Sequence, residues 1–406
     1  ALFDGTAFAE SGVVLVTFNY RLNIFGSFAH PLLSKESGHG ASGNYGLMDQ
    51  VAVLRWVQKN ISAFGGDPDR VTLFGESAGG RAVALLMIAP SSRGLFHRAI
   101  AQSGAVRAVS FSLEEREQFG RKMAAELGCD RKPDPLQALR SKSWKELSSV
   151  AEGFISDPIV DGWVVPPEPR VLWAQGKQHD VPMILGSNKH EATLRLSPGV
   201  PGTRSIQDYE QMVRRLYGPK AEQLLSVYRP NSDAEAFEML VRIRTDTSHT
   251  MPARNAARWM SNVSSAAYFY HFTRVPPDPR LKDKGARHGT ELRYVFNTIG
   301  QGGGIGVGGV GDPSLLEEAD WRLSKTMMAY WTQFAATGNP NREGLVDWPP
   351  YEPGTDQYLE LGEQIRVGEG LYRRGLDLLE MLMIERYLSG QRPVLWAPIR
   401  ARGPIL

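Results

Sequence analysis

Apolar residues along the chain gather in short runs that are separated by stretches with helical spacing. The run from Gly12 to Asn19 is continuous and rich in β-branched residues, which predicts a strand covered on both faces of a parallel sheet. Further short apolar runs predict strands over Val71 to Phe74, Arg98 to Gln102, Val181 to Leu185 and Ala266 to Phe272. The pattern therefore predicts a sheet assembled from segments that lie far apart in the chain.

Two stretches between these runs carry an apolar stripe at helical spacing. The first stripe ends at the turn Gly65-Gly66-Asp67-Pro68 and consists of Leu47, Val51, Leu54, Val57 and Ile61. In the second, we expect Asp312-Pro313 to begin a long helix that Gly338 ends. Its apolar face consists of Leu316, Leu323, Met327, Trp331 and Phe334. Strands that alternate with helices predict the α/β class, with a mostly parallel, doubly wound sheet.

The length of the chain fits one large domain. A chain of 406 residues exceeds the usual size of a single core, but large α/β enzymes grow by insertions around one sheet. We predict one domain over residues 1–406, with helical excursions near 113–150 and 206–260. The chain opens on Ala1, without an initiator methionine, and we expect it to be incomplete at its N-terminus.

Charge and composition narrow the classes of partner. The formal net charge is +2 with both signs interspersed, which argues against a nucleic-acid or anionic-membrane surface. Apolar residues make up 42% of the chain, yet the longest apolar run is far shorter than the ~20 residues of a membrane helix. Cys129 is the single cysteine, so no disulfide can form within the chain. Compartment and oligomeric state stay open at this point.

One turn has the pattern of a nucleophile. Gly75-Glu76-Ser77-Ala78-Gly79 follows a predicted strand and precedes good helix formers over Arg81 to Ile88, which is the context of a G-x-S-x-G serine. Glycines let the strand and helix backbones approach, so we expect Ser77 to be strained with its hydroxyl projecting. The N–H of Ala78 would then point at an oxyanion. The pattern predicts Ser77 as a nucleophile.

A serine nucleophile needs a histidine base, and the base needs a carboxylate. In α/β-hydrolases the chain order is serine, acid, histidine. Five of the eight histidines violate this order or leave too little chain for an acid: His30, His39, His97, His179 and His190. Of the others, His249 and His271 fall in a predicted helix and a predicted strand, where packing is the expected role, while His288 falls in a loop. The residues alone favour His288 without deciding the choice.

Several long motifs resemble the type-B carboxylesterase and cholinesterase family. They are NYRLNIFG, GNYGLMDQVAVLRWVQKNISAFGGDPDRVTLFGESAGG, SSRGLFHRAIAQSGA, MILGSNKHEATL, ARHGTELRYVF and YWTQFAATGNPN. The match keeps its order over nearly the whole chain. The resemblance implies an α/β-hydrolase fold and a serine carboxylesterase that needs no metal or organic cofactor and takes a small-molecule ester. Because Cys129 has no cysteine partner, unlike the paired cysteines of secreted animal members, the resemblance favours a microbial source.

The resemblance assigns three catalytic roles. The family's nucleophile matches Ser77 in GESAGG, its base matches His288 in ARHGTEL and its acid matches Glu191 in GSNKHEATL. The family's acid stands in an Asp-Glu-Gly triplet, whereas this chain has His190-Glu191-Ala192, so we expect the acid loop to be positioned differently. The competing acids rank lower; they are Asp161, which belongs to the segment IVDGW, and Asp283.

Neighbouring residues receive supporting or structural roles. Glu76 and Ser103 resemble positions that support the triad, with ordinary core hydrogen bonding as the alternative. We interpret Glu291 as a helix-start carboxylate, since no histidine stands at a spacing complementary for a metal. The segment Gly300 to Gly311 lacks the lysine of a phosphate loop and predicts a mobile surface loop.

The resemblance also implies a missing part. Family members carry a His-Gly-Gly-Gly-type loop shortly before the segment that matches Phe3-Asp4-Gly5, and its N–H groups complete the oxyanion hole. Only Ala78 then remains as a donor, and losing one donor typically costs ~10²–10³ in turnover, so we expect the 406 residues alone to be weak or inactive. We also expect a gap or a collapse in the sheet between 12–19 and 71–74. Two alternatives are a non-catalytic adhesion or binding protein of the same fold and a partial chain without function.

Overall fold

Six strands form one sheet in the computed structural model, which describes residues 2–106, 109, 111–151, 154 and 156–388. They are β1 (Thr72–Glu76), β2 (Arg98–Gln102), β3 (Met183–Asn188), β4 (Ala267–Phe272), β5 (Gln357–Leu361) and β6 (Ile365–Glu369). The strands lie side by side in chain order; the first five are parallel and β6 is antiparallel to β5. The four later strand predictions are confirmed as β1 to β4, whereas the sequence pattern did not predict β5 and β6.

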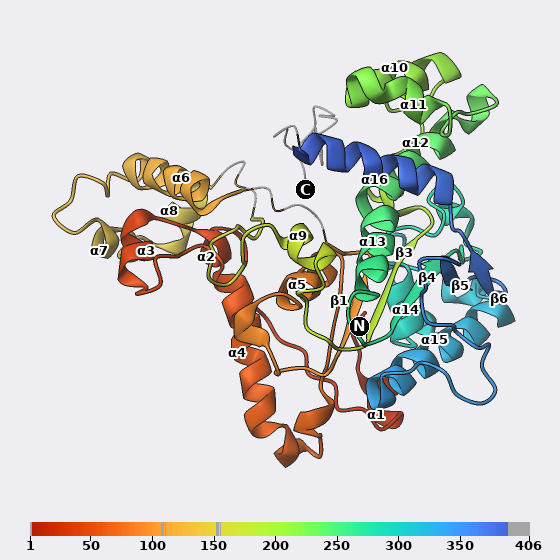
Figure 1. The fold of residues 1–406 in the computed structure, drawn as a ribbon, viewed down its shortest axis with the longest axis horizontal. Helices are drawn as coiled ribbons and strands as arrows, with labels where there is room; N and C mark the ends of the chain where they lie inside the picture. Colours follow the sequence, from red (N-terminus) through yellow and green to blue (C-terminus); the bar gives the residue numbers. More distant parts are fainter. Residues whose placement is uncertain (1, 107–108, 110, 152–153, 155, 389–406) are drawn as a thin grey trace.

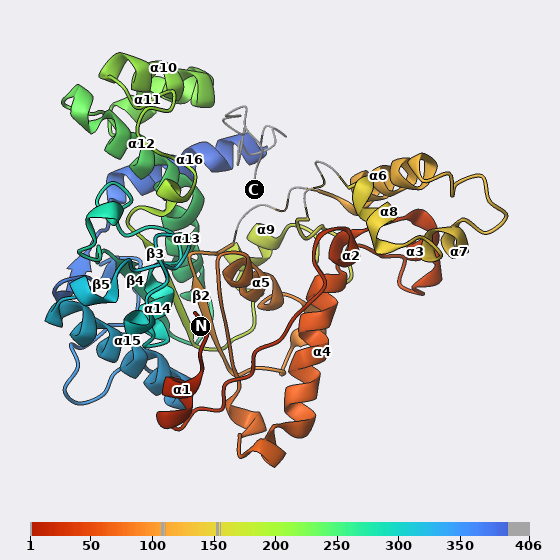
Figure 2. The same cartoon turned by 180° about the vertical axis from the view of Figure 1, so that it is seen from behind.

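Helices cover both faces of the sheet, as a doubly wound fold requires. On one face α5 (Ala78–Leu86), α9 (Pro169–Ala174) and α13 (Met251–Met260) pack on alternate strand residues such as Ala101 and Leu185. On the other face α14 (Glu291–Val295) and α15 (Glu318–Thr337) pack on the intervening residues. Figures 1 and 2 show the sheet between these two layers. Every residue of β3 and β4 is buried, which explains their continuous apolar runs.

The remaining helices lie around the edge of the sheet or away from it. They are α1 (Thr6–Glu10), α2 (Asn23–Ser27), α3 (Pro31–Glu36), α4 (Tyr45–Asn60), α6 (Leu113–Glu126), α7 (Pro135–Arg140), α8 (Trp144–Ser149), α10 (Ile206–Tyr217), α11 (Ala221–Leu225), α12 (Ala236–Thr245) and α16 (Arg373–Leu388). The apolar stripe of α4 is buried as predicted. No helix among the described residues has the length and apolar character that crossing a membrane requires.

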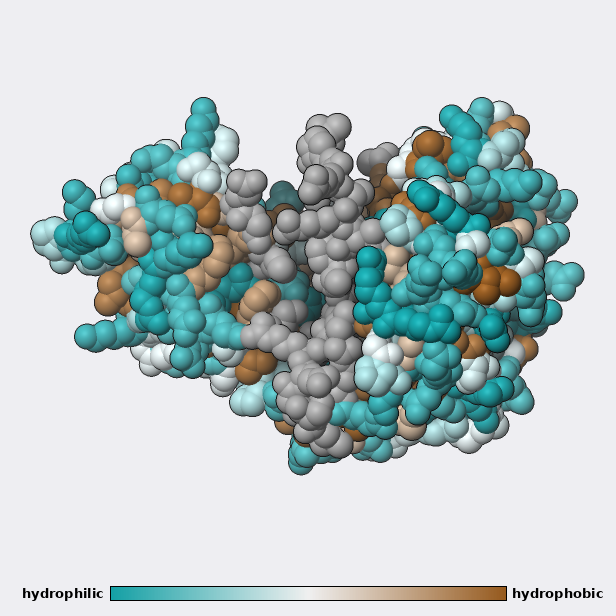
Figure 3. All heavy atoms as spheres, turned by 90° about the horizontal axis from the view of Figure 1, so that it is seen from above, coloured by the Kyte–Doolittle hydropathy of each residue, from teal (hydrophilic) through white to brown (hydrophobic). Residues whose placement is uncertain are grey.

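Both regions that were predicted to be helical excursions are helical. Figure 1 shows α6, α7 and α8 beside α2 and α3, on the far side of α4 from the sheet. The helices α10, α11 and α12 stand at the opposite end of the molecule, next to α16. Seen from above, apolar side chains are scattered among polar ones on both of these parts (Figure 3). That residues 1–406 form one domain stays a prediction.

Residues 12–19 do not form a strand, so that prediction is wrong. Val14 and Phe18 are 42% and 40% exposed. A cavity of about 270 Å³ lies between this segment and β1, with Val13, Leu15 and Leu73 in its lining. Backbone N–H and C=O groups need a neighbouring strand, and no strand among the described residues pairs with 12–19. The cavity lies between the two segments that were expected to flank a gap.

The start of the long helix also differs from the prediction. Asp312 accepts a hydrogen bond from the N–H of Ser314 and caps only the short 3-10 turn Pro313–Leu315. The long helix α15 begins at Glu318, where the Glu317 and Asp320 carboxylates cap each other's backbone N–H groups. Leu316 therefore precedes the helix. Its other predicted apolar positions are buried, and Gly338 ends the helix in a left-handed conformation with φ 80°.

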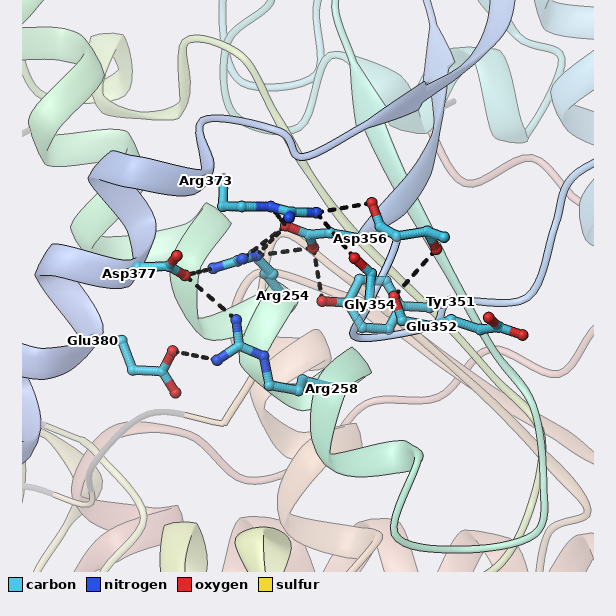
Figure 4. A network of polar contacts seen from close by, with 10 residues as sticks. Arg254, Arg258, Tyr351, Glu352, Gly354, Asp356, Arg373, Asp377 and Glu380 are labelled. Carbon is cyan, nitrogen blue, oxygen red and sulfur yellow. Dashed lines mark hydrogen bonds and ion pairs between the residues drawn. The ribbon is translucent and has the colours of Figure 1, made fainter.

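A network of buried ion pairs joins α16 to the rest of the fold. Arg254 on α13 donates two hydrogen bonds to the Asp356 carboxylate just before β5 and another, of 2.6 Å, to Asp377 on α16. Tyr351 donates its hydroxyl to the same Asp356 carboxylate at 2.7 Å. Figure 4 shows these side chains converging from three segments. The network fixes α16 against α13 at a point where both side chains of the Arg254–Asp356 pair are excluded from water.

Candidate active site

The turn after β1 holds Ser77 in a strained backbone conformation, as predicted. Its φ is 57° and its ψ is −113°. Such a conformation costs about 1–3 kcal/mol and persists only where the surroundings enforce it. The N–H of Ser77 donates to the carbonyl of Gln102 at 2.8 Å, and its own carbonyl accepts from the N–H of Arg81 at 2.9 Å. Helix α5 begins at Ala78, earlier than the predicted helix formers that start at Arg81.

Close approach of main-chain segments explains most of the glycines around Ser77. A Cβ on Gly75 would lie 2.6 Å from the carbonyl carbon of Gly79, and one on Gly80 would lie 2.7 Å from the Gln102 oxygen. A Cβ on Gly104 would lie 2.1 Å from the Ser77 carbonyl oxygen, whereas one on Gly79 would meet nothing within 4 Å. Steric need is therefore strongest at Gly75, Gly80 and Gly104. Gly104 received no role from the sequence.

The three predicted catalytic side chains meet where three parallel strands end. Ser77 follows β1, Glu191 comes three residues after β3, and His288 lies in the loop beyond β4. Because these strands are parallel, their carboxyl ends share one edge of the sheet. The Nε2 atom of His288 is 2.7 Å from Ser77 Oγ, and its Nδ1 atom is 2.5 Å from Glu191 Oε2. The imidazole therefore bridges the hydroxyl and the carboxylate.

The acid loop holds the Glu191 carboxylate firmly despite its unusual neighbours. The Glu191 side chain is fully buried, and its Oε1 accepts the N–H of Asn188 at 2.7 Å while Oε2 faces His288. Both carboxylate oxygens are therefore engaged. The competing acids lie elsewhere: Asp161 accepts the N–H groups of the turn that follows it, and Asp283 is exposed.

Burial and charge act in opposite directions on the pKa of His288. Burial lowers it, but the carboxylates of Glu191, Glu76 and Glu291 outweigh burial and raise this pKa to about 9. Burial raises the pKa of Glu191, yet the imidazoles of His249 and His288 bring it below its ordinary value. Burial, followed by nearby carboxylates, raises the pKa of both Glu76 and Glu291. The His288 imidazole therefore holds its proton tightly and is most available as a base at alkaline pH, while Glu191 stays ionised.

The predicted supporting residues have different surroundings. Glu76 Oε1 lies 3.1 Å from His288 Nε2, so this carboxyl contacts the imidazole directly. Ser103 has φ 50°, its N–H donates to the Gly186 carbonyl at 2.9 Å, and its hydroxyl has no hydrogen-bond partner within the described part of the chain. Its role in supporting the triad stays a prediction.

Glu291 begins α14, as predicted, but it is also a buried part of the site that the sequence did not reveal. Its carboxylate accepts hydrogen bonds from the side-chain amides of Asn188 and Gln102. These partners come from the ends of β3 and β2. Contacts between residues so far apart in the chain have no local sequence signal.

A second imidazole stands beside the triad. His249 lies in the π-helical turn Asp246–Thr250 between α12 and α13, and its ring centroid is 5.2 Å from that of His288. Glu191, His249 and His288 offer ligand atoms within 4.8 Å of one another. Two ligands of one tetrahedral metal ion are about 3.3 Å apart, from metal–ligand distances near 2 Å. Since Glu191 and His288 are only 2.5 Å apart, metal binding would break their hydrogen bond.

The glycine-rich segment 300–311 lies next to the histidine loop. Arg287 and Lys284 donate to the carbonyl of Ile305 at 2.5 and 3.3 Å, and Arg293 donates to the carbonyl of Gly308 at 3.0 Å. The side chain of Val307 is 55% exposed and passes within 3.1 Å of the position that a Cβ on Gly289 would occupy. The segment thus has the external contacts that its composition requires, and its mobility stays a prediction.

Comparisons with known proteins show the family that the chain resembles. The model of the carboxylesterase family matches residues 1–379. The fumonisin B1 esterase of Sphingopyxis macrogoltabida is 35% identical over 384 residues, which cover 91% of this chain and 67% of that protein. Mouse neuroligin-2 is 34% identical over 411 residues, which cover 90% of this chain and 47% of that protein.

A solved structure extends the likeness to the fold. The structure of PNB esterase superposes with a TM-score of 0.75 at 31% sequence identity, covering 93% of this chain and 77% of that one. Over the aligned part, PNB esterase therefore has the same overall fold as this chain. Matched over residues 1–379 and folded like a solved esterase, this chain belongs to the carboxylesterase family of serine ester hydrolases with the α/β-hydrolase fold.

Proposed function

We propose that this chain hydrolyses small carboxylic esters through an acyl-enzyme, with Ser77 as nucleophile, His288 as base and Glu191 as its acid partner. The observation that carries the proposal is the position of the His288 imidazole, 2.7 Å from the serine hydroxyl and 2.5 Å from the carboxylate. The first distance suits proton transfer from the hydroxyl to the imidazole, and the second is a short hydrogen bond of the kind that orients the base.

Each group has one task in this mechanism. His288 takes the proton of Ser77 through Nε2 as the serine oxygen attacks the ester carbonyl, and then gives this proton to the departing alcohol. A water molecule, deprotonated by the same nitrogen, attacks the acyl group and releases the acid. Glu191 stays ionised, holds the Nδ1–H tautomer of the imidazole and stabilises the imidazolium. The lowered pKa of Glu191 supports this role.

We assign the backbone N–H of Ala78 as a hydrogen-bond donor to the oxyanion. Ala78 is the first residue of α5, so its N–H has no acceptor within the helix and lies at the positive end of the helix dipole. Removing one oxyanion donor typically slows turnover ~10²–10³-fold, so the Ala78 N–H is central to the proposed mechanism.

Labelling with a fluorophosphonate tests the proposal, because the reagent reacts only with an activated serine. We expect one label on Ser77 by peptide mass spectrometry and no label in Ser77→Ala. Ser141→Ala, which removes an exposed serine after α7, is the matched control and should label like the parent. Labelling that survives Ser77→Ala would contradict the assignment of the nucleophile.

A non-catalytic binding protein of the same fold is the second candidate. A binding protein does not require an activated serine, so it predicts no labelling and no ester turnover. Absence of label from the folded parent chain would favour this alternative over the esterase.

A further inference from the structure

The acid loop and the histidine loop are tied together directly. The backbone N–H of His190 donates to the carbonyl of Ala286 at 2.9 Å, and the Ala286 N–H donates back to His190 Nδ1 at 3.0 Å. The side chain of Asn188 also donates to the Arg287 carbonyl at 2.8 Å. These bonds join the residues on either side of the Glu191–His288 contact. One of them uses the side chain of His190.

The imidazole of His190 is held at both nitrogens. Its Nε2 lies 3.1 Å from Glu238 Oε1 on α12, and its Nδ1 accepts the Ala286 N–H. The hydrogen bond to His190 is the foremost cause that lowers the pKa of Glu238, so this carboxylate is the acceptor. A neutral imidazole with its proton on Nε2 satisfies both partners, because it donates to the carboxylate and accepts from the backbone.

The backbone is shaped around this imidazole. A Cβ on Gly285 would lie 2.3 Å from His190 Nδ1, and Gly285 has φ +60°. The side chain of His190 is 12% exposed. The imidazole therefore fills the space between the acid loop, the histidine loop and α12, where a side chain without an acceptor, such as alanine, would leave the Ala286 N–H unpaired.

We propose that His190 is a positioning residue for the triad: its Nδ1 accepts the Ala286 N–H and so holds the loop of His288 against Glu191, while Glu238 on α12 only orients the ring. The inference rests on the proposed function, because it gives His190 a role only through that triad. It also explains how the sequence His190-Glu191-Ala192 keeps the acid carboxylate in place. A displacement of about 1 Å between catalytic groups can cost 10²-fold in rate.

Variants at position 190 separate the two contacts. His190→Ala removes both, and we expect the rate of fluorophosphonate labelling at Ser77 to fall about ten- to hundredfold. His190→Asn keeps an acceptor at the place of Nδ1 but cannot reach Glu238, and we expect it to recover the parent rate to within about threefold. Rescue by asparagine is not expected if His190 only fills space.

The matched control is His97→Ala. His97 Nδ1 also accepts a backbone N–H, that of Val71, at 3.3 Å, but this bond lies at the start of β1. We expect labelling of His97→Ala to stay within twofold of the parent. Urea midpoints for all variants show whether a slow variant is folded.

A second measurement does not depend on turnover. The proton between His288 Nδ1 and Glu191 should give a downfield NMR signal in the parent and in His190→Asn, and lose it in His190→Ala. If the parent neither labels nor turns over esters, the proposed function fails. The NMR signal still tests whether the His190–Ala286 hydrogen bond holds His288 against Glu191. If folded His190→Ala keeps both the NMR signal and the labelling rate, the inference about His190 is overturned while the proposed function stands. A loss that asparagine does not rescue would also overturn it.

Discussion

Removing the guanidinium of Arg254 should destabilise the fold far more than removing its exposed partner. The side chains of Arg254 and Asp356 are 2% and 1% exposed, whereas that of Asp377 is 50% exposed. Arg254→Met keeps the length of the side chain but leaves the Asp356 charge buried, with the Tyr351 hydroxyl at 2.7 Å and the Arg373 guanidinium at 3.5 Å. Losing one partner of a buried pair costs about 3–5 kcal/mol.

The two remaining contacts of Asp356 place the expected cost of Arg254→Met near the lower end, about 3 kcal/mol. Asp377→Asn removes a half-exposed charge and should cost less than about 1 kcal/mol. The double variant Arg254→Met/Asp356→Asn has no buried charge left at the pair, and asparagine tolerates the φ of 57° at this position. We therefore expect it to be more stable than Arg254→Met alone.

Urea unfolding followed by the fluorescence of the nine tryptophans measures these differences. Both the midpoint and the slope of each urea transition should be compared. A changed slope would indicate a loss of two-state unfolding, and the midpoint would then no longer report stability alone. Equal costs for Arg254→Met and Asp377→Asn would refute the argument from burial. So would a double variant that is less stable than the single one.

The remaining predictions concern the site. Glu191→Gln should lower the ester turnover of the chain about 10³- to 10⁴-fold with little change in KM, measured with p-nitrophenyl acetate, because an amide cannot stabilise the imidazolium. The rate should rise with pH as His288 loses its proton, with a midpoint above the ordinary histidine range since its pKa is raised to about 9. Glu76→Gln removes one of the carboxylates that raise this pKa, so it should move the midpoint of the pH–rate profile down by about one pH unit; an unchanged midpoint would exclude an ionised Glu76. Gly104→Ala should abolish labelling of Ser77, since its Cβ would lie 2.1 Å from the Ser77 carbonyl oxygen, whereas Gly79→Ala, with open space around it, is the control that should retain labelling.

Strands with a continuous apolar run could be predicted from the sequence, while β5 and β6 could not. The runs of β1 to β4 are apolar because helices cover both sides of the sheet. β5 and β6 form an antiparallel pair at one edge, and polar residues or glycine interrupt their apolar residues, so they lack a continuous run. The apolar run over residues 12–19 has the pattern of a buried strand, but no paired neighbour among the described residues.

The site was predictable to the extent that its chemistry is encoded locally. Ser77 stands in a turn whose glycines and flanking elements all lie within a few residues. Glu191 and His288 follow from resemblance to a family, because nothing in their own segments requires them to meet. The positions of His249 and Glu291 beside the triad depend on how α13 and α14 pack on the sheet. Such packing leaves no signal in the spacing of a single sequence.

Because the catalytic groups lie far apart along the chain, Ser77 can be reactive only after distant segments have folded together. The hydrogen-bonded atoms of His288 and Ser77 belong to residues 211 positions apart, and those of His288 and Glu191 to residues 97 apart. A covalent probe at the serine thus counts only those molecules in which the loops after β1, β3 and β4 have all assembled. During refolding, the gain of probe signal should therefore lag behind the gain of helical circular dichroism.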